Sequence, residues 1–195
     1  MSMMNKTKKL TIIAMLAALA SVLMFFSFNV PLMPPFIKFD FSELPAAVAA
    51  GLLGPVSGVV VCLVKNLVNL YFTTTGGVGE LSNFILGCLF VVPMGIICKK
   101  LKGVKGAAIG ALVGAFTMAV GSVFTNYFIV YPVYTAFIPM DAIMNMYQTI
   151  NKNADSLIKA LLMFNMPFTF FKGLCSSAIV LLLSKKNILK SIKKL

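Results

Sequence analysis

Lysine clusters separated by long apolar stretches constrain this chain more than any other feature of its sequence. Twelve of the seventeen basic residues, all of them lysine, fall in three clusters: Lys6, Lys8 and Lys9; Lys99, Lys100, Lys102 and Lys105; and Lys185, Lys186, Lys190, Lys193 and Lys194. The five acidic residues all lie between these clusters: Asp40, Glu43, Glu80, Asp141 and Asp155. Cytoplasmic loops of membrane proteins are enriched in lysine and arginine. The pattern therefore predicts a multi-pass membrane protein with both the N- and the C-terminus in the cytoplasm.

The composition favours the same class of protein. Apolar residues make up 59% of the 195 residues, and the mean hydropathy is +0.96, whereas soluble proteins contain roughly 45–50% apolar residues. A chain of this length has room for one integral membrane domain, residues 1–195, and for no separate soluble catalytic domain. Because the lysines flank apolar spans, the net charge of +12 indicates contact with membrane lipid and not with nucleic acid.

The apolar stretches predict an all-α membrane protein with six transmembrane helices: 10–28, 44–53, 56–72, 80–98, 107–129 and 157–183. The proline-rich segment 29–35 ends the first helix, because prolines lack the N–H donor that a helix needs. Gly54 and Pro55 predict a turn between the second and third helices. The alternative is one kinked span over 44–72, which would leave the middle lysine cluster outside, against the charge asymmetry. Residues 131–155 are expected on the outer side, partly as an amphipathic helix.

The sequence carries none of the motifs of an enzyme. It has no histidine, no nucleotide-binding Walker loop and no metal-ligand cluster. The four cysteines lie in or beside apolar spans without paired spacing, which indicates core residues and not disulfides or metal ligands: Cys62, Cys88, Cys98 and Cys175. We therefore expect no catalytic residues, no metal site and no cofactor, and active transport would need energy from partner subunits.

Charged side chains within the predicted spans are candidates for function, because each costs roughly 2.5–3.5 kcal/mol on membrane-insertion scales. These residues and their polar neighbours are Lys65, Glu80 and Lys172 with Asn66, Asn69, Asn83, Asn126 and Thr169. In the six-helix topology they come from four helices and face one region that opens outward, which predicts a ligand pocket. The alternative is that Glu80 pairs with Lys65 or Lys172 and only joins helices.

The loop after the first helix has a pattern of its own. Residues 36–45 alternate apolar and polar side chains, so an extended conformation points Phe39 and Phe41 to one side and Lys38, Asp40 and Ser42 to the other. Such a loop can cover a pocket, with its aromatic rings against a flat ligand and its polar side chains as hydrogen-bonding groups. The alternative is an amphipathic loop that lies on the lipid headgroups.

The first helix carries two alanines four residues apart, Ala14 and Ala18. Small residues at this spacing lie on one helix face and let another membrane helix approach closely. The pair therefore predicts a docking surface for a membrane partner.

Six segments in this order resemble one transporter family: 38–45 (KFDFSELP), 54–58 (GPVSG), 65–67 (KNL), 79–84 (GELSNF), 126–132 (NYFIVYP) and 167–173 (PFTFFKG). The chain resembles, over nearly its whole length, the riboflavin-specific branch of the S components of energy-coupling factor (ECF) vitamin transporters. The resemblance implies the S-component fold and a vitamin pocket under the first loop. It also implies that Ala14 and Ala18 dock on a transmembrane coupling subunit, which two cytoplasmic ATPase subunits drive.

The resemblance also implies where the ligand binds. It assigns residues 38–42, Asn126, Thr169 and Lys172 to the pocket, although Thr169 stands where the family pattern has asparagine, so the amide donor is lost there. Riboflavin is uncharged, and it fits a pocket with aromatic walls and a few polar groups. The full set of expected ligand contacts is Lys38, Phe39, Asp40, Phe41, Ser42, Glu80, Asn83, Phe84, Asn126, Tyr131, Thr169 and Lys172.

The expected function is therefore that of a non-catalytic subunit in the cell membrane, which captures riboflavin from outside for an ATP-driven importer. Three alternatives stay open from the residues. The chain could be an S component for another vitamin, an ion-coupled secondary transporter with Glu80 as its ion site, or a small membrane enzyme or scaffold.

Overall fold

The computed structural model describes residues 5–73, 75–101, 103–136 and 138–185. Lys102 and the last four lysines of the third cluster lie outside these residues. The described residues are mostly helical, and the elements follow in this order: α1 (Lys6–Phe25), β1 (Phe28–Asn29), β2 (Lys38–Phe39), α2 (Glu43–Leu53), α3 (Pro55–Leu70), α4 (Val78–Lys100), α5 (Gly103–Thr125), the π-helical turn η1 (Asn126–Val130), α6 (Tyr131–Tyr134), α7 (Met140–Ile150), α8 (Leu157–Ala160), the π-helical turn η2 (Leu161–Asn165) and α9 (Met166–Lys185).

Four of the described helical segments are long and apolar enough to cross a membrane: Lys6–Phe25, Val78–Lys100, Gly103–Tyr134 and Leu157–Leu182. The helices α2 and α3 are apolar but shorter. Gly54 separates them with a φ of +102°, a conformation that favours glycine, and Pro55 then begins α3 at a position where a proline needs no N–H donor.

The fifth apolar segment continues beyond residue 129, its predicted end, and reaches Tyr134. Pro132 does not end this helix, because the π-helical turn η1 shifts the hydrogen-bond register just before it. The proline then stands in the first turn of α6, where its missing N–H is tolerated. Pro167 follows η2 in the same way near the start of α9.

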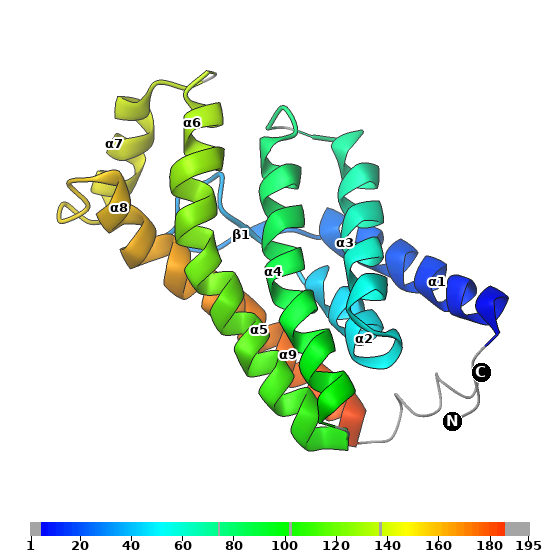
Figure 1. Cartoon of the computed structure of the whole chain (residues 1–195). Coiled ribbons are helices and arrows are strands. Elements are labelled where there is room, and N and C mark those ends of the chain that lie inside the picture. Colours follow the sequence, from blue (N-terminus) through cyan, green and yellow to red (C-terminus); the bar gives the residue numbers. More distant parts are fainter. Residues whose placement is uncertain (1–4, 74, 102, 137, 186–195) are drawn as a thin grey trace.

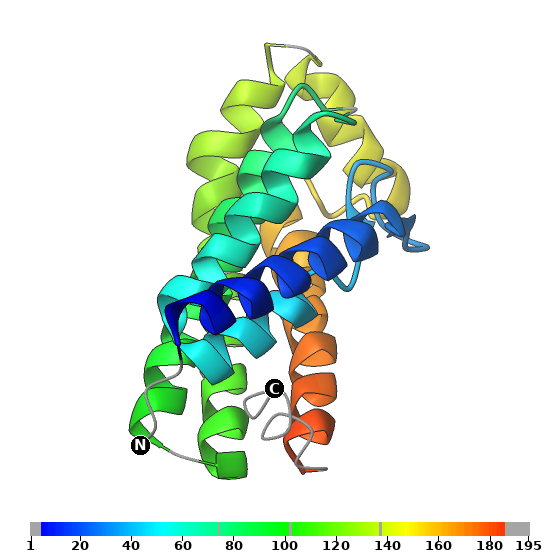
Figure 2. The same ribbon diagram turned by 90° about the vertical axis from the view of Figure 1, so that its right-hand side faces the viewer.

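The long helices form a bundle with two recognisable ends (Figure 1). The upper end carries the 71–77 turn, α6 and α7, and the lower end carries the α2–α3 turn, the α4–α5 turn and the end of α9. Helix α5 packs between α4 and α9, while α2 and α3 pack on the other side of α4. Helix α1 crosses α2 and α3 obliquely on the outside of the bundle (Figure 2).

Small residues bring the helices of the lower core into close contact. A Cβ atom at Gly58 of α3 would lie 2.8 Å from the Cβ of Ala50 in α2, and a Cβ atom at Gly114 of α5 would lie 2.5 Å from the carbonyl oxygen of Phe90 in α4. A second apolar cluster lies at the upper end, around the buried side chains of Tyr131 and Tyr147. The bundle thus has two apolar clusters, one in the lower core and one at the upper end.

The α1–α2 loop forms a short hairpin and not a strand over 36–45. β1 and β2 pair antiparallel, with Phe28 opposite Phe39 and Asn29 opposite Lys38. The extended conformation ends after β2, and α2 begins at Glu43. The loop lies behind the helices at the level of the upper half of the bundle (Figure 1).

Candidate functional site: a polar cavity under the first loop

A hollow in two adjoining parts lies in the upper half of the bundle. The inner part has a volume of about 130 Å³, and the outer part has a volume of about 740 Å³. Five residues line both parts, so the two parts lie next to each other: Phe36, Lys38, Gly79, Asn83 and Tyr134. The walls of the inner part come from the α1–α2 loop, α4, α5, the η1–α6 segment, η2 and α9. The outer part is also lined by residues of α1, α3 and α7.

Eight of the twelve residues predicted as ligand contacts line this hollow. Lys38, Asn83, Asn126, Tyr131, Thr169 and Lys172 line the inner part, and Lys38, Asp40, Glu80 and Asn83 line the outer part. The other four predicted residues, Phe39, Phe41, Ser42 and Phe84, do not line it.

The aromatic residues outside the walls pack against the loop or the core instead of facing the cavity. Phe39 is only 4% exposed, and its ring packs against Phe28, Phe41, Phe168 and Phe171 at centroid distances of 5.2–6.3 Å. Phe84 packs against the lower core. The spacing rule separates Phe39 and Phe41 from the polar residues of the loop, but it does not say which side faces the ligand.

Three polar residues of the last helical segment share one face and point to the inner cavity: Asn165, Thr169 and Lys172. All three are buried, at 5–7% exposure, and their spacing of four and three residues places them along one helix face. Sequence reasoning missed Asn165. Its amide lies one turn before Thr169, so the inner cavity has an amide group on this face although position 169 is threonine.

Lys172 also holds the α1–α2 loop. Its Nζ donates a hydrogen bond to Oδ2 of Asp40 at 2.8 Å. Burial by itself would raise the pKa of the Asp40 carboxyl, but the charges of Lys172 and Lys65 outweigh it and lower this pKa to about 2. Asp40 is therefore ionised at neutral pH, and the ion pair links the loop to α9.

A second buried ion pair lies behind the first. Lys65 of α3 donates from Nζ to Oε1 of Glu43 in α2 at 2.7 Å, and both side chains have no exposed surface. The alternative interpretation of the sequence, in which Glu80 pairs with Lys65 or Lys172, does not hold in this structure, because these lysines pair with Glu43 and Asp40. Glu43 is the partner of Lys65 because it begins α2 directly behind the loop, at the level of Lys65 on the neighbouring helix.

Glu80 instead holds the turn between α3 and α4. Its Oε2 accepts hydrogen bonds from the hydroxyls of Thr73 and Thr75 at 2.8 and 3.2 Å, and its Oε1 accepts one from Nδ2 of Asn69 at 3.2 Å. One helical turn later, Oδ1 of Asn83 is buried in the cavity wall without a hydrogen-bond partner. An unpaired acceptor at this position favours a ligand that brings a donor.

Helix α7 closes the cavity region from the side. The Tyr147 hydroxyl donates to Oδ1 of Asn165 at 2.6 Å and also bonds the Tyr131 hydroxyl. Burial raises the pKa of the Tyr147 phenol, which keeps it a donor. Other wall residues that sequence reasoning missed are Phe36, Tyr134, Met146 and Phe168. Single aromatic or methionine residues carry no signal that distinguishes a cavity wall from a core.

The site combines aromatic walls with amide, hydroxyl and ammonium groups, which suits the binding of a flat polar molecule. Within the described residues, no three histidine, cysteine or acidic side chains gather as metal ligands would. The geometry is that of a binding site.

Comparisons with known proteins agree with the fold and identify the family. A family model described as the substrate-specific component of ECF transporters matches residues 8–184. The riboflavin transporter FmnP of Bacillus subtilis (strain 168) is 34% identical over 175 residues, which are 87% of this chain and 86% of that protein. The riboflavin transporter RibU of Staphylococcus aureus (strain TCH60) is 32% identical over 191 residues, which are 97% of this chain and 96% of that protein.

A solved structure gives the same result for the fold. It is described as "Structure and mechanism of the S component of a bacterial ECF transporter", and it matches with a TM-score of 0.75 and 31% identity over 97% of this chain and 99% of that one. The family and the apolar helices make this a multi-pass membrane protein that works with an ECF module. The chain therefore belongs to the S components, the substrate-binding membrane subunits of ECF transporters, which are not enzymes.

Proposed function

We propose that this S component captures riboflavin from outside the cell and delivers it to an ATP-driven importer. The observation that carries the proposal is the mixed lining of the cavity, where the rings of Phe36, Tyr134 and Phe168 stand beside polar groups. Riboflavin has a flat aromatic ring system, uncharged carbonyl and amide groups, and a polyhydroxyl chain. The names of the relatives at 32–34% identity point to the same ligand.

The contacts follow from the chemistry of the walls. Aromatic rings favour the ring system through stacked or edge contacts. Lys172 and the amides of Asn126 and Asn165 can donate to carbonyl and hydroxyl oxygens of the ligand, while the unpaired Oδ1 of Asn83 can accept from it. Because Asp40 balances the charge of Lys172, an uncharged ligand fits without an additional counter-ion.

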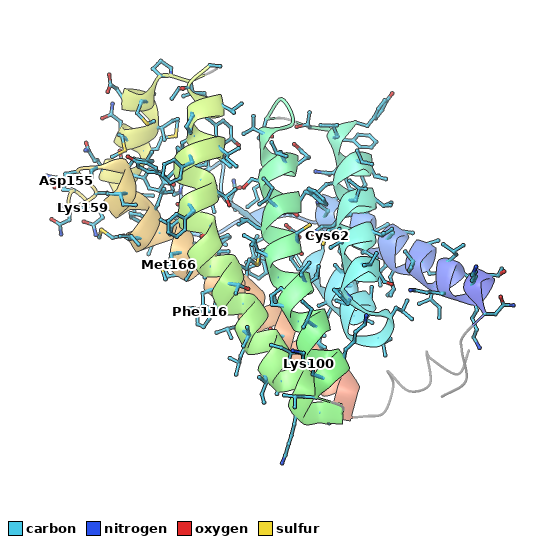
Figure 3. All side chains as sticks on the ribbon, in the orientation of Figure 1. Cys62, Lys100, Phe116, Asp155, Lys159 and Met166 are labelled. Atoms are coloured by element: carbon cyan, nitrogen blue, oxygen red, sulfur yellow. The ribbon has the colours of Figure 1, made fainter. Side chains whose placement is uncertain are left out.

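The proposed topology has six crossings of the cell membrane with both termini in the cytoplasm. The described lysines Lys99, Lys100 and Lys105 stand at the lower end, around the α4–α5 turn, and Lys100 is labelled there (Figure 3). The positive-inside rule puts this end in the cytoplasm, so the cavity at the opposite end opens outward. Six apolar helical segments, two of them short, supply the crossings.

The proposed partners are a transmembrane coupling subunit and two cytoplasmic ATPase subunits. Ala14 and Ala18 are exposed on α1, whereas Ala17 and Ala20 of the same helix are buried in the bundle. The exposed alanine face is free for another helix to approach. In this mechanism the loop closes over the bound vitamin, and the docked subunit then reorients in the membrane to release it inside.

The test is a titration of the purified, ligand-free protein in detergent, followed by the fluorescence of riboflavin. We expect saturable quenching with one riboflavin per chain at sub-micromolar concentration, because the ring system would enter an aromatic-lined cavity. Thiamine and biotin should not compete. A folded, ligand-free sample that does not quench riboflavin fluorescence contradicts the assignment of this vitamin, and the same sample can then be tested with other vitamins.

A further inference from the structure

Five buried side chains form one continuous chain of hydrogen bonds, which we name the charged network. Its members, in order of contact, are Glu43, Lys65, Ser42, Asp40 and Lys172. Each is at most 5% exposed. Of these five, only Asp40 and Lys172 line the hollow. The other three members can therefore affect a ligand only through Asp40 and Lys172.

The direction of the hydrogen bonds in the charged network is fixed by chemistry. The ammonium group of Lys65 can only donate, and it donates to Oε1 of Glu43 and to Oγ of Ser42, both at 2.7 Å. The Ser42 hydroxyl accepts this bond, and its own hydrogen is directed to Oδ1 of Asp40. The backbone N–H of Ser42 donates to the same oxygen at 2.8 Å.

This arrangement fixes the Asp40 carboxylate and leaves its second oxygen for the cavity lysine. With Oδ1 held by two donors from Ser42, Oδ2 points to Nζ of Lys172 at 2.8 Å. The position of the Lys172 ammonium group at the cavity wall therefore depends on Ser42, and the orientation of Ser42 depends on Lys65. Buried ion pairs contribute little net stability compared with apolar pairs of the same size, so stability alone does not account for two of them here.

We propose that Lys65 is a positioning residue for ligand binding. Through Ser42 and Asp40, Lys65 holds the α1–α2 loop over the cavity and keeps Lys172 in place to contact the ligand. Lys65 itself does not touch the ligand. The inference deepens the proposed function, and the identity of the ligand in its second test rests on that proposal. Loss of the charged network should loosen the loop and weaken binding together.

The first test needs no ligand. Hydrogen–deuterium exchange of residues 36–42 is measured in the ligand-free protein for two variants. One variant is Ser42→Ala. The other is the double variant Lys65→Met/Glu43→Gln, which removes both charges of the buried pair and so leaves neither of them unpaired. We expect exchange at least several-fold faster than in the unmodified chain. The matched control is Ser57→Ala on the same helix as Lys65, because Ser57 Oγ is buried without a hydrogen-bond partner. Unchanged exchange in both network variants overturns the proposal.

The second test is a double-mutant cycle on riboflavin affinity. Ser42→Ala should raise the Kd about tenfold, the range expected when a hydrogen bond to a charged group is lost. In a Lys172→Met background the same change should add less than twofold, because the residue it positions is gone. Equal effects in both backgrounds overturn the route through Lys172. If the unmodified protein binds no riboflavin, the proposed vitamin is wrong, and the exchange result alone decides the role of Lys65.

Discussion

At the scale of single residues, two lysines that would be costly inside a membrane are both neutralised by nearby acids. Lys172 pairs with Asp40 and Lys65 pairs with Glu43. Only Lys172 borders the cavity. One pair can therefore contact the ligand, while the other belongs to the support behind it.

Lys172→Met should weaken riboflavin binding at least tenfold. The change removes a charged donor at the cavity wall and leaves Asp40 buried without its cation. The measurement is the fluorescence titration. The matched control is Lys159→Met, because Lys159 is 55% exposed and pairs with Asp155 at the outer edge of the molecule (Figure 3). Equal affinity of the two variants would show that Lys172 makes no contact with the ligand.

The ion pair of Asp40 should make the stability of the folded protein depend on pH in the acid range. Its pKa is lowered from 3.8 to about 2 in the folded protein, so its ion pair contributes stability above pH 3.8 that is lost as the pH falls toward 2. The contribution is on the order of 2 kcal/mol. Thermal unfolding in detergent between pH 5 and 2 should show a larger loss for the unmodified protein than for Asp40→Asn. Parallel curves would rule out this role of Asp40.

The sequence could identify part of the site because charged and amide residues within apolar spans are rare and conspicuous. This signal found Asn126, Thr169 and Lys172, which line the inner cavity. The same signal also marks Asn165, an amide within the last apolar span, but sequence reasoning did not use it. Its place on the cavity face depends on the π-helical turn η2. Sequence reasoning also missed Glu43, because an acid at the start of a helix ordinarily faces solvent and favours the helix dipole.

At the scale of the elements, turn-forming residues in the sequence predicted where one helix ends and the next begins better than they predicted how long each helix is. Gly54 and Pro55 mark the α2–α3 turn, and the structure has it there. The extension of the α5 segment to Tyr134 could not be predicted, because Pro132 normally ends a helix and only the π-helical turn before it allows the helix to continue. The position of the loop against α9 depends on a contact between residues far apart in the sequence, Asp40 and Lys172.

Substitutions on the exposed face of α1 should affect docking to the partner subunits without affecting riboflavin binding. Ala18→Phe places a large side chain on the exposed face, so vitamin uptake with the ECF module should be abolished while riboflavin binding by the isolated subunit stays unchanged. Ala17, the preceding residue, is buried in the bundle and only 2% exposed, so Ala17→Phe should instead overpack the bundle and lower its thermal stability. Normal uptake by the Ala18→Phe protein would exclude this face as the docking surface.

The close approach of α2, α3 and α4 predicts a contrast between two glycines. A Cβ atom at Gly58 would lie within about 3 Å of both neighbouring helices, whereas one at Gly51 would meet its nearest atoms at 3.9 Å. Gly58→Ala should therefore cost about 1–3 kcal/mol, and Gly51→Ala should be neutral or stabilising by up to about 1 kcal/mol. Melting temperatures in detergent measure both, and equal shifts would contradict this packing.

At the scale of the whole molecule, the cavity, the lysines and the small residues of α1 lie in three different places: the upper end, the lower end and one side. The upper end holds the cavity under its loop, the lower end carries lysines, and α1 presents small residues on the outside. The prediction of the S-component family from short sequence segments is confirmed by the comparisons. The sequence shows no ATPase motif, and the family to which the chain belongs works with an ECF module.

The most direct test of the account is riboflavin uptake into proteoliposomes that contain this chain together with the coupling subunit and the two ATPase subunits. We predict uptake only when all components and ATP are present. Lys172→Met should lower this uptake, and collapse of ion gradients should leave it unchanged. Uptake by this chain alone, driven by a proton or sodium gradient, would contradict the account and would favour an ion-coupled transporter.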